Sequence, residues 1–103
     1  MPSTVQFKDF IIEQLRNMQN IVCRPMMGEY LLYHNGILFG GIYDDRLLIK
    51  RTNSNQIYSL PEEIPYEKAK SMYMVDNLDD IDYLSELIQI TCNDLRDKEN
   101  KNG

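Results

Sequence analysis

The chain has 103 residues, of which 43% are hydrophobic, 26% charged and 10% aromatic, and this favours one soluble domain with one core. Seven tyrosines and three phenylalanines exclude a disordered chain, and only five glycines and four prolines exclude a collagen-like or linker sequence. No apolar run approaches the roughly 18 residues of a membrane span. The first residues also lack the basic start of a secretory signal, so we expect a cytoplasmic protein.

The formal net charge of −5 is distributed unevenly along the chain. Residues 1–50 carry five basic and five acidic side chains, whereas residues 51–103 carry six basic and eleven acidic ones. Tight binding to DNA or RNA requires a clustered positive surface, because counterion release supplies most of the non-specific affinity. We therefore expect no direct tight binding to nucleic acid. Cys23 and Cys92 form no Cys-x-x-Cys pair, so we expect two free thiols with structural roles.

The first predicted element is an amphipathic helix over residues 4–19, with a capping box formed by Ser3 and Gln6. Its apolar residues recur at spacings of three and four, and they are Phe7, Phe10, Ile11, Leu15 and Met18. A short strand over residues 21–23 follows. The pair Arg24-Pro25 is expected to close this strand, because a residue before proline is restricted in its backbone conformation.

The clearest local signal is Asn35-Gly36, the preferred pair of a type I′ hairpin turn, between β-favouring runs at 30–34 and 37–43. Asp44-Asp45 predicts a second hairpin, which leads into residues 46–50. Together these segments predict a three-stranded antiparallel meander. Counting outward from the two-residue turns pairs His34 with Ile37, Leu32 with Phe39, Tyr43 with Arg46, and Gly41 with Leu48.

This register sorts the side chains of the meander into two faces. The expected core face is almost wholly apolar and holds Leu31, Tyr33, Leu38, Gly40, Ile42, Leu47 and Ile49. The other face is mixed and holds Tyr30, Leu32, His34, Ile37, Phe39, Gly41, Tyr43, Arg46, Leu48 and Lys50. The mixed face is too apolar for ordinary solvent surface and too charged for a closed core. A β-bulge at Gly40-Gly41 would exchange the two faces beyond it.

The second half of the chain predicts a loop, a strand and a helix. Residues 52–70 are polar and contain two prolines, which indicates a long loop with one helical turn near residues 55–58. Residues 71–76 form the next predicted strand. Asn77 is then expected to cap a helix that runs to about Arg96.

This order of elements indicates an α+β domain. We expect a mainly antiparallel sheet of about five strands, with the N- and C-terminal helices packed on one of its faces. Residues 1–97 would form the single domain, and residues 98–103 a frayed tail.

Few residues point to chemistry, so we expect no catalytic residue, metal or cofactor. His34 is the only histidine, and its place beside a tight turn is typical of a solvated hairpin tip. Asp76, Asp79, Asp80 and Asp82 form an acidic set that helix capping explains better than a cation site, because the ligand spacing and glycine of a calcium loop are missing. Gly28 and Gly40-Gly41 precede no lysine-bearing helix start and form no phosphate-binding motif.

The segment Arg24-Pro25-Met26-Met27-Gly28-Glu29-Tyr30 suits either an irregular core junction or an adaptable contact surface. With Leu31-Leu32-Tyr33, Asn35-Gly36 and the run Asp44-Asp-Arg-Leu-Leu-Ile-Lys50, it resembles the N-terminal domain family of TfoX (Sxy), regulators of natural competence in bacteria. The resemblance covers about residues 5–95. This chain departs from the family pattern with Met27 where phenylalanine is usual and Glu29 where a second glycine is common.

The resemblance implies a compact α+β domain similar to secretion-chaperone-like folds, with no known catalytic activity. Family members that activate competence genes carry a second, helical C-terminal domain. A stand-alone domain of this kind is expected to keep the fold, and its assignment to transcription rests on analogy.

Two functions follow as hypotheses. In the first, the domain binds another protein, either a transcription regulator or a second copy of itself, through the mixed face. The candidate contact residues are Arg24, Met26, Met27, Gly28, Tyr30, Phe39, Tyr43 and Lys50. The alternative for this face is that the loop at 52–70 simply covers it.

In the second hypothesis, the domain binds a small molecule or anion through Arg24, Arg46, Lys50 and Arg51. Salt bridges to Asp44, Asp45 or Glu29 would explain those cations more simply.

Overall fold

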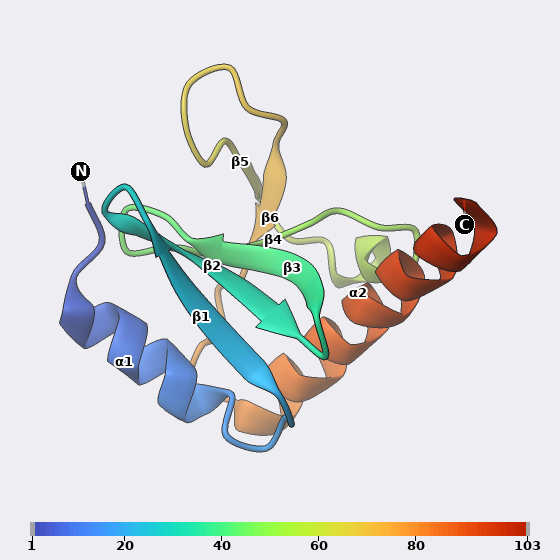
Figure 1. Cartoon of the computed structure of the whole chain (residues 1–103), viewed down its shortest axis with the longest axis horizontal. Coiled ribbons are helices and arrows are strands. Elements are labelled where there is room, and N and C mark those ends of the chain that lie inside the picture. Colours follow the sequence, from blue (N-terminus) through green and yellow to red (C-terminus); the bar gives the residue numbers. More distant parts are fainter. Residues whose placement is uncertain (1, 103) are drawn as a thin grey trace.

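A computed structural model describes the backbone of residues 2–102 and the side chains of residues 2–98 (Figure 1). In chain order the elements are α1 (Val5–Gln14), β1 (Ile21–Met26), β2 (Glu29–His34), β3 (Ile37–Ile42), β4 (Leu47–Ile49), the 3₁₀ helix η1 (Ser54–Tyr58), β5 (Glu62–Glu63), β6 (Met72–Met74) and α2 (Ile81–Asn102). The strands form one antiparallel sheet of six in the order β1-β2-β3-β4-β6-β5. The predicted α+β class is confirmed. The extra strand is β5, which pairs with β6 from within the predicted loop.

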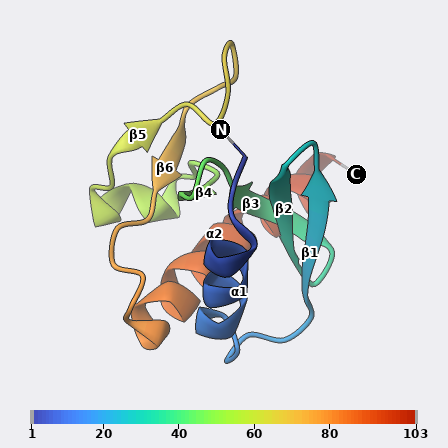
Figure 2. The same cartoon turned by 90° about the vertical axis from the view of Figure 1, so that its left-hand side faces the viewer.

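Both helices pack on one side of the twisted sheet, between β1–β2 and β5–β6 (Figure 2). The core lies between the helices and this side of the sheet, and its buried side chains are Ile11, Leu15, Leu32, Phe39, Ile42, Leu47, Ile49, Leu60, Val75, Leu84, Leu87, Ile88 and Cys92. We call this side of the sheet the helix face and the other side the open face. Within the described residues, no helix is both long and apolar enough to cross a membrane.

The register between β2 and β3 corrects the predicted faces. His34 pairs with Ile37 as predicted, but Leu32 pairs with Gly40 and not with Phe39, so Phe39 is an extra residue in a β-bulge. Every residue of β2 is therefore on the face opposite to the predicted one. Tyr30, Leu32, His34 and Phe39 belong to the helix face, whereas Leu31, Tyr33 and Leu38 belong to the open face. Beyond the bulge the prediction holds, since Gly41 pairs with Leu48 and the core residues Ile42, Leu47 and Ile49 share one side.

Two glycines follow the bulge because the backbone leaves no room for a side chain there. A Cβ atom on Gly40 would lie 2.2 Å from the carbonyl oxygen of Leu48 in the neighbouring strand. A Cβ atom on Gly41 would lie 2.5 Å from the carbonyl oxygen of Tyr30 and 2.8 Å from the ring of Tyr43. The close approach of β4 therefore depends on Gly40, and the packing of the Tyr43 ring beside β2 depends on Gly41.

Three two-residue turns join the first four strands, and each has two residues with positive φ. Asn35-Gly36 and Asp44-Asp45 form the two predicted turns. The third, Met27-Gly28, was not predicted, since the strand was expected to close at Arg24-Pro25. Instead β1 continues through Pro25, which an edge strand tolerates because its outer N–H groups need no partner strand. Residues 24–30 thus form a regular hairpin and not an irregular core junction.

The first helix does not begin with the predicted capping box, because Ser3 has other partners, and it also ends earlier than predicted. The Thr4 hydroxyl caps α1 by accepting a hydrogen bond from the backbone N–H of Phe7 at 3.1 Å. The N–H and the hydroxyl of Ser3 both donate to the Glu29 carboxylate, at 2.9 and 2.7 Å. The helix ends at Gln14, five residues before the predicted Gln19.

The second helix begins at Ile81, and Asp80 caps it by accepting a hydrogen bond from the N–H of Tyr83 at 3.0 Å. The predicted cap, Asn77, lies before the helix. The helix continues past the predicted end at Arg96 to Asn102. Of the predicted frayed tail, Gly103 lies outside the described residues.

Candidate functional site

Both ring nitrogens of His34 are committed to structural hydrogen bonds. The ring is 5% exposed, which corrects the expected solvated hairpin tip. Its Nδ1 lies 2.7 Å from the carbonyl oxygen of Gln19 and its Nε2 lies 3.2 Å from the amide nitrogen of Asn35. A carbonyl oxygen can only accept, so Nδ1 donates to Gln19, and the partner at Nε2 assigns it as the acceptor of the Asn35 amide N–H. His34 thus fastens the α1–β1 connection to the β2–β3 turn.

The two cysteines and the acidic set at residues 76–82 also have structural roles. Cys23 and Cys92 are free thiols, as predicted. Burial raises the pKa of Cys92 to about 11 and also raises that of Cys23. Helix capping is confirmed for Asp80, and no group of three or more potential metal ligands occurs among the described residues.

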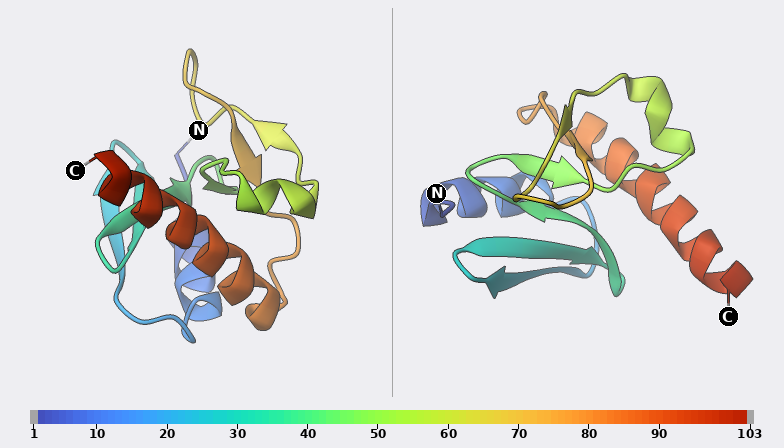
Figure 3. Two further views of the ribbon diagram at one scale, coloured as in Figure 1. Left: turned by 90° about the vertical axis from the view of Figure 1, so that its right-hand side faces the viewer. Right: turned by 90° about the horizontal axis from the view of Figure 1, so that it is seen from above.

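A groove of about 670 Å³ crosses the open face of the sheet. Among the helices that the structure describes, α2 alone contributes residues to the groove lining, and Figure 3 (right) shows the sheet from above. The groove is lined by residues from the sheet, the β5–β6 loop and the last turns of α2, and they are Met26, Leu31, Leu38, Gly40, Tyr43, Lys50, Arg51, Pro65, Tyr66, Ala69, Lys70, Ser71, Met72, Leu95 and Lys98.

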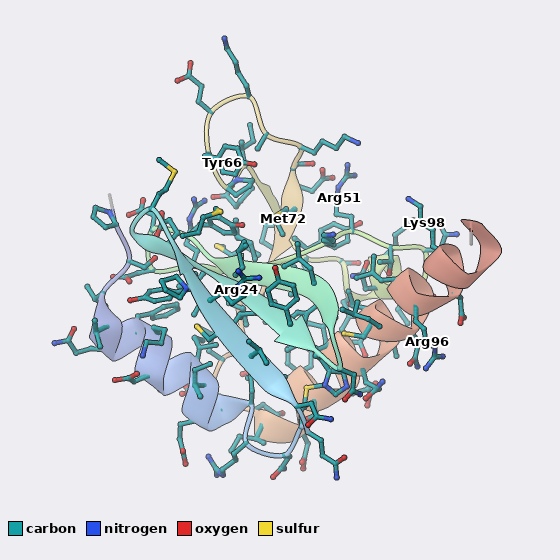
Figure 4. The ribbon with its side chains drawn as sticks, viewed as in Figure 1. Arg24, Arg51, Tyr66, Met72, Arg96 and Lys98 are labelled. Carbon is teal, nitrogen blue, oxygen red and sulfur yellow. The ribbon has the colours of Figure 1, made fainter. Side chains whose placement is uncertain are left out.

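The floor of the groove is apolar because alternate strand positions point to the open face. Leu31 of β2, Leu38 of β3 and Met72 of β6 are each half-buried there. Arg24 of β1 pairs with Leu31 and lies on the same face (Figure 4).

The β5–β6 loop forms one wall of the groove and covers part of the open face. The ring of Tyr66 packs on that of Tyr43 with centroids 6.2 Å apart, which leaves Tyr43 only 6% exposed. This burial raises the pKa of Tyr43, so its phenol stays neutral. Arg46 holds the loop through Glu63 at 3.3 Å and the carbonyl oxygen of Ile64 at 3.4 Å. The loop therefore covers the Tyr43 end of the face and leaves the rest of the groove open.

Within residues 2–98, the groove lining contains four basic side chains and no carboxylate. Arg51 lies 3.5 Å from Glu62 at the rim and donates to the carbonyl oxygen of Ser71. Lys50, Lys70 and Lys98 have no ion pair with any side chain that the structure describes.

Arg24, Arg46, Lys50 and Arg51 were expected either to bind an anion or to form salt bridges within the chain, and the contacts now distinguish the two. Arg46 and Arg51 form ion pairs with Glu63 and Glu62, and not with the expected Asp44, Asp45 or Glu29. Arg24 and Lys50 form no ion pair within the described part of the chain. The simpler explanation therefore holds for two of the four.

The predicted contact residues separate into three groups. Met26, Tyr43 and Lys50 line the groove, and Arg24 lies on the same face. Tyr30 and Phe39 are on the helix face, where Phe39 is fully buried, so the prediction that they form an exposed contact surface is wrong. Met27, 98% exposed, and Gly28 form the β1–β2 turn.

Several lining residues could not be predicted from the sequence. Strict alternation along β2 and β3 predicts that Leu31 and Leu38 lie in the core, because it does not include the bulge at Phe39. Lys70 and Met72 border the β5–β6 loop, and no local sequence pattern predicts the path of this loop over the sheet. Lys98 falls in the predicted tail.

Glu29, a departure from the family pattern, anchors the N-terminal segment. Besides the two hydrogen bonds from Ser3, its Oε2 accepts one from the N–H of Asp44 at 3.1 Å. Asp45 accepts hydrogen bonds from the N–H and hydroxyl of Thr4 at 2.8 and 3.2 Å. The carboxylates thus join residues 3–4 to two hairpin turns.

Comparison of the sequence with known proteins identifies a relative and a family. A protein of Spirochaeta aurantia named "Uncharacterized 12.7 kDa protein in trpE 5'region" is 26% identical over 95 residues, which cover 89% of this chain and 83% of that protein. Residues 13–91 match the TfoX N-terminal domain family. The matched segment includes the whole sheet and most of the groove. On this match the chain belongs to the TfoX N-terminal domain family.

Proposed function

We propose that this domain is non-enzymatic and acts by binding another protein through the groove on its open face. The observation that carries the proposal is the uncovered apolar floor at Leu31, Leu38 and Met72, while the opposite face of the same sheet holds the core. Exposed apolar patches with a polar rim are typical of contact surfaces. Methionine adds a flexible side chain that adapts to a partner.

The proposed partner is a transcription regulator, in keeping with the competence role of TfoX proteins. A net charge of −5 opposes direct attraction to nucleic acid, so an effect on transcription would pass through a protein. A small anion is the weaker candidate, because Arg46 and Arg51 already have carboxylate partners.

Site-specific photocrosslinking in cells of the source organism tests the proposal. A benzoylphenylalanine in place of Leu38 would probe the groove, and the same group in place of Ile57 is the control. Ile57 is 82% exposed on η1 and does not line the groove. We expect irradiation to give a discrete adduct with a second protein from position 38 and none from position 57.

Two outcomes would overturn the proposal. The first is the absence of any protein adduct at position 38 while the variant remains folded by circular dichroism. The second is an adduct made of two copies of this chain, since the proposed partner is a different protein.

A further inference from the structure

The charge of the groove is opposite to that of the whole chain. The chain has 16 acidic and 11 basic residues, yet the part of the groove lining that the structure describes has four basic residues and no acidic one. Such a surface attracts an anionic partner and repels a cationic one, because complementary charge raises the rate and selectivity of encounter.

Three carboxylates near the groove have partners elsewhere. Glu62 pairs with Arg51 at the rim, at 3.5 Å. Asp94, beside the end of the groove, accepts hydrogen bonds from the N–H and hydroxyl of Ser54, both at 2.8 Å. Asp97 lies 3.5 Å from Arg96. Among the side chains that the structure describes, none forms an ion pair with Lys50, Lys70 or Lys98, so these three lysines can pair with an outside anion.

The apolar floor narrows the class of ligand further. Leu31, Leu38 and Met72 would stay partly hydrated beneath a purely ionic ligand, whereas apolar side chains of a partner would displace that water. Nucleic acid fits less well than a peptide. Of the two tyrosines of the groove, Tyr43 is only 6% exposed, and a stacking platform needs several rings that are free to receive bases.

We propose that the groove binds an acidic segment rich in apolar residues, contributed by a partner protein. Its carboxylates pair with Lys50, Lys70 and Lys98, and its apolar side chains cover Leu31, Leu38 and Met72. This inference rests on the proposed function and specifies the chemistry of the partner.

Fluorescence anisotropy with synthetic peptides tests the inference. One peptide alternates leucine or phenylalanine with glutamate, a second replaces every glutamate by glutamine, and a third replaces every glutamate by lysine. Polyglutamate serves as a probe without apolar groups. We expect the glutamate peptide to bind about tenfold or more tightly than the other three, with an affinity that falls as salt rises.

Charge-reversal variants locate the binding. Lys70→Glu and Lys98→Glu change exposed groove residues without ion pairs in the described structure, and each should weaken the glutamate peptide about fivefold or more. Arg16→Glu is the matched control, since it makes the same change in net charge on an exposed residue of the α1–β1 connection, outside the groove. It should leave the affinity within about twofold.

Equal binding of the glutamine peptide or of polyglutamate would overturn the inference. So would equal weakening by Arg16→Glu, or tighter groove-dependent binding of a single-stranded oligonucleotide. A protein crosslinked at position 38 together with a failed peptide titration would overturn only the acidic chemistry. The absence of any crosslinked protein would overturn the proposed function itself.

Discussion

Asn55 is the polar residue that ties the end of β4 to η1 and α2. It is fully buried, and its Oδ1 accepts a hydrogen bond from the N–H of Thr52 at 2.9 Å. Its Nδ2 donates to the carbonyl oxygen of Lys50 and to the hydroxyl of Thr91, both at 2.9 Å. The same hydroxyl donates to the carbonyl oxygen of Leu87. The backbone of Lys50, a groove residue, is thereby fixed against the helix.

Replacing Asn55 by alanine should destabilise the fold by about 2–3 kcal/mol, because three polar partners, of which the Thr91 hydroxyl is buried, would lose a hydrogen bond. Asn53→Ala is the control, since Asn53 is exposed and its side chain makes no capping hydrogen bond. It should change stability by less than about 0.5 kcal/mol. Urea denaturation of both variants measures the difference. Equal midpoints would show that the buried amide contributes nothing.

The two thiols should differ in reactivity towards a disulfide reagent such as DTNB. At pH 8 the thiol of Cys92 is protonated, because its burial raises the pKa to about 11, and only the thiolate reacts. Cys23, which is half-buried, should react alone and slowly in the native protein, since its pKa is also raised. The second thiol should appear only in urea. A Cys23→Ser variant that still showed a native reactive thiol would contradict the burial of Cys92.

At the scale of elements, the β-bulge at Phe39 decides which side chains each face receives. Type I′ turn residues predicted the hairpins at Asn35-Gly36 and Asp44-Asp45, because positive φ is a local preference. The bulge depends on how closely β4 approaches Gly40, and such a tertiary contact leaves no periodic signal. Strict alternation of side chains therefore predicts the correct faces for the side chains of β4 and the wrong faces for those of β2.

Gly40→Ala should weaken the sheet more than Gly36→Ala. A Cβ atom at position 40 meets the carbonyl oxygen of Leu48 at 2.2 Å, so the strands must separate, which we expect to cost more than about 3 kcal/mol. Gly36 has φ +80 and open space around it, so alanine there adds only backbone strain of about 1 kcal/mol. Thermal denaturation of both variants tests this order. The reverse order would contradict the close approach of β4.

At the scale of the whole molecule, the two faces of the sheet have different roles. One face packs against both helices and holds the core, and the other offers an apolar and basic groove (Figures 2 and 4). The α+β class could be predicted because helical and strand periodicities are local and strong. The groove could be predicted only in part, since Met26, Tyr43 and Lys50 were identified, whereas Leu38, Lys70 and Lys98 meet only through the fold.

The assignment of the two faces is tested most directly by the difference in unfolding free energy between Phe39→Ser and Leu38→Ser, measured by urea denaturation. Phe39 is fully buried on the helix face, so its removal should open a cavity and cost about 3–5 kcal/mol. Leu38 is half-buried at the open groove, so its replacement should cost less than about 1.5 kcal/mol. Equal losses, or a larger loss for Leu38→Ser, would contradict a core on the helix face and an open face free to bind a partner.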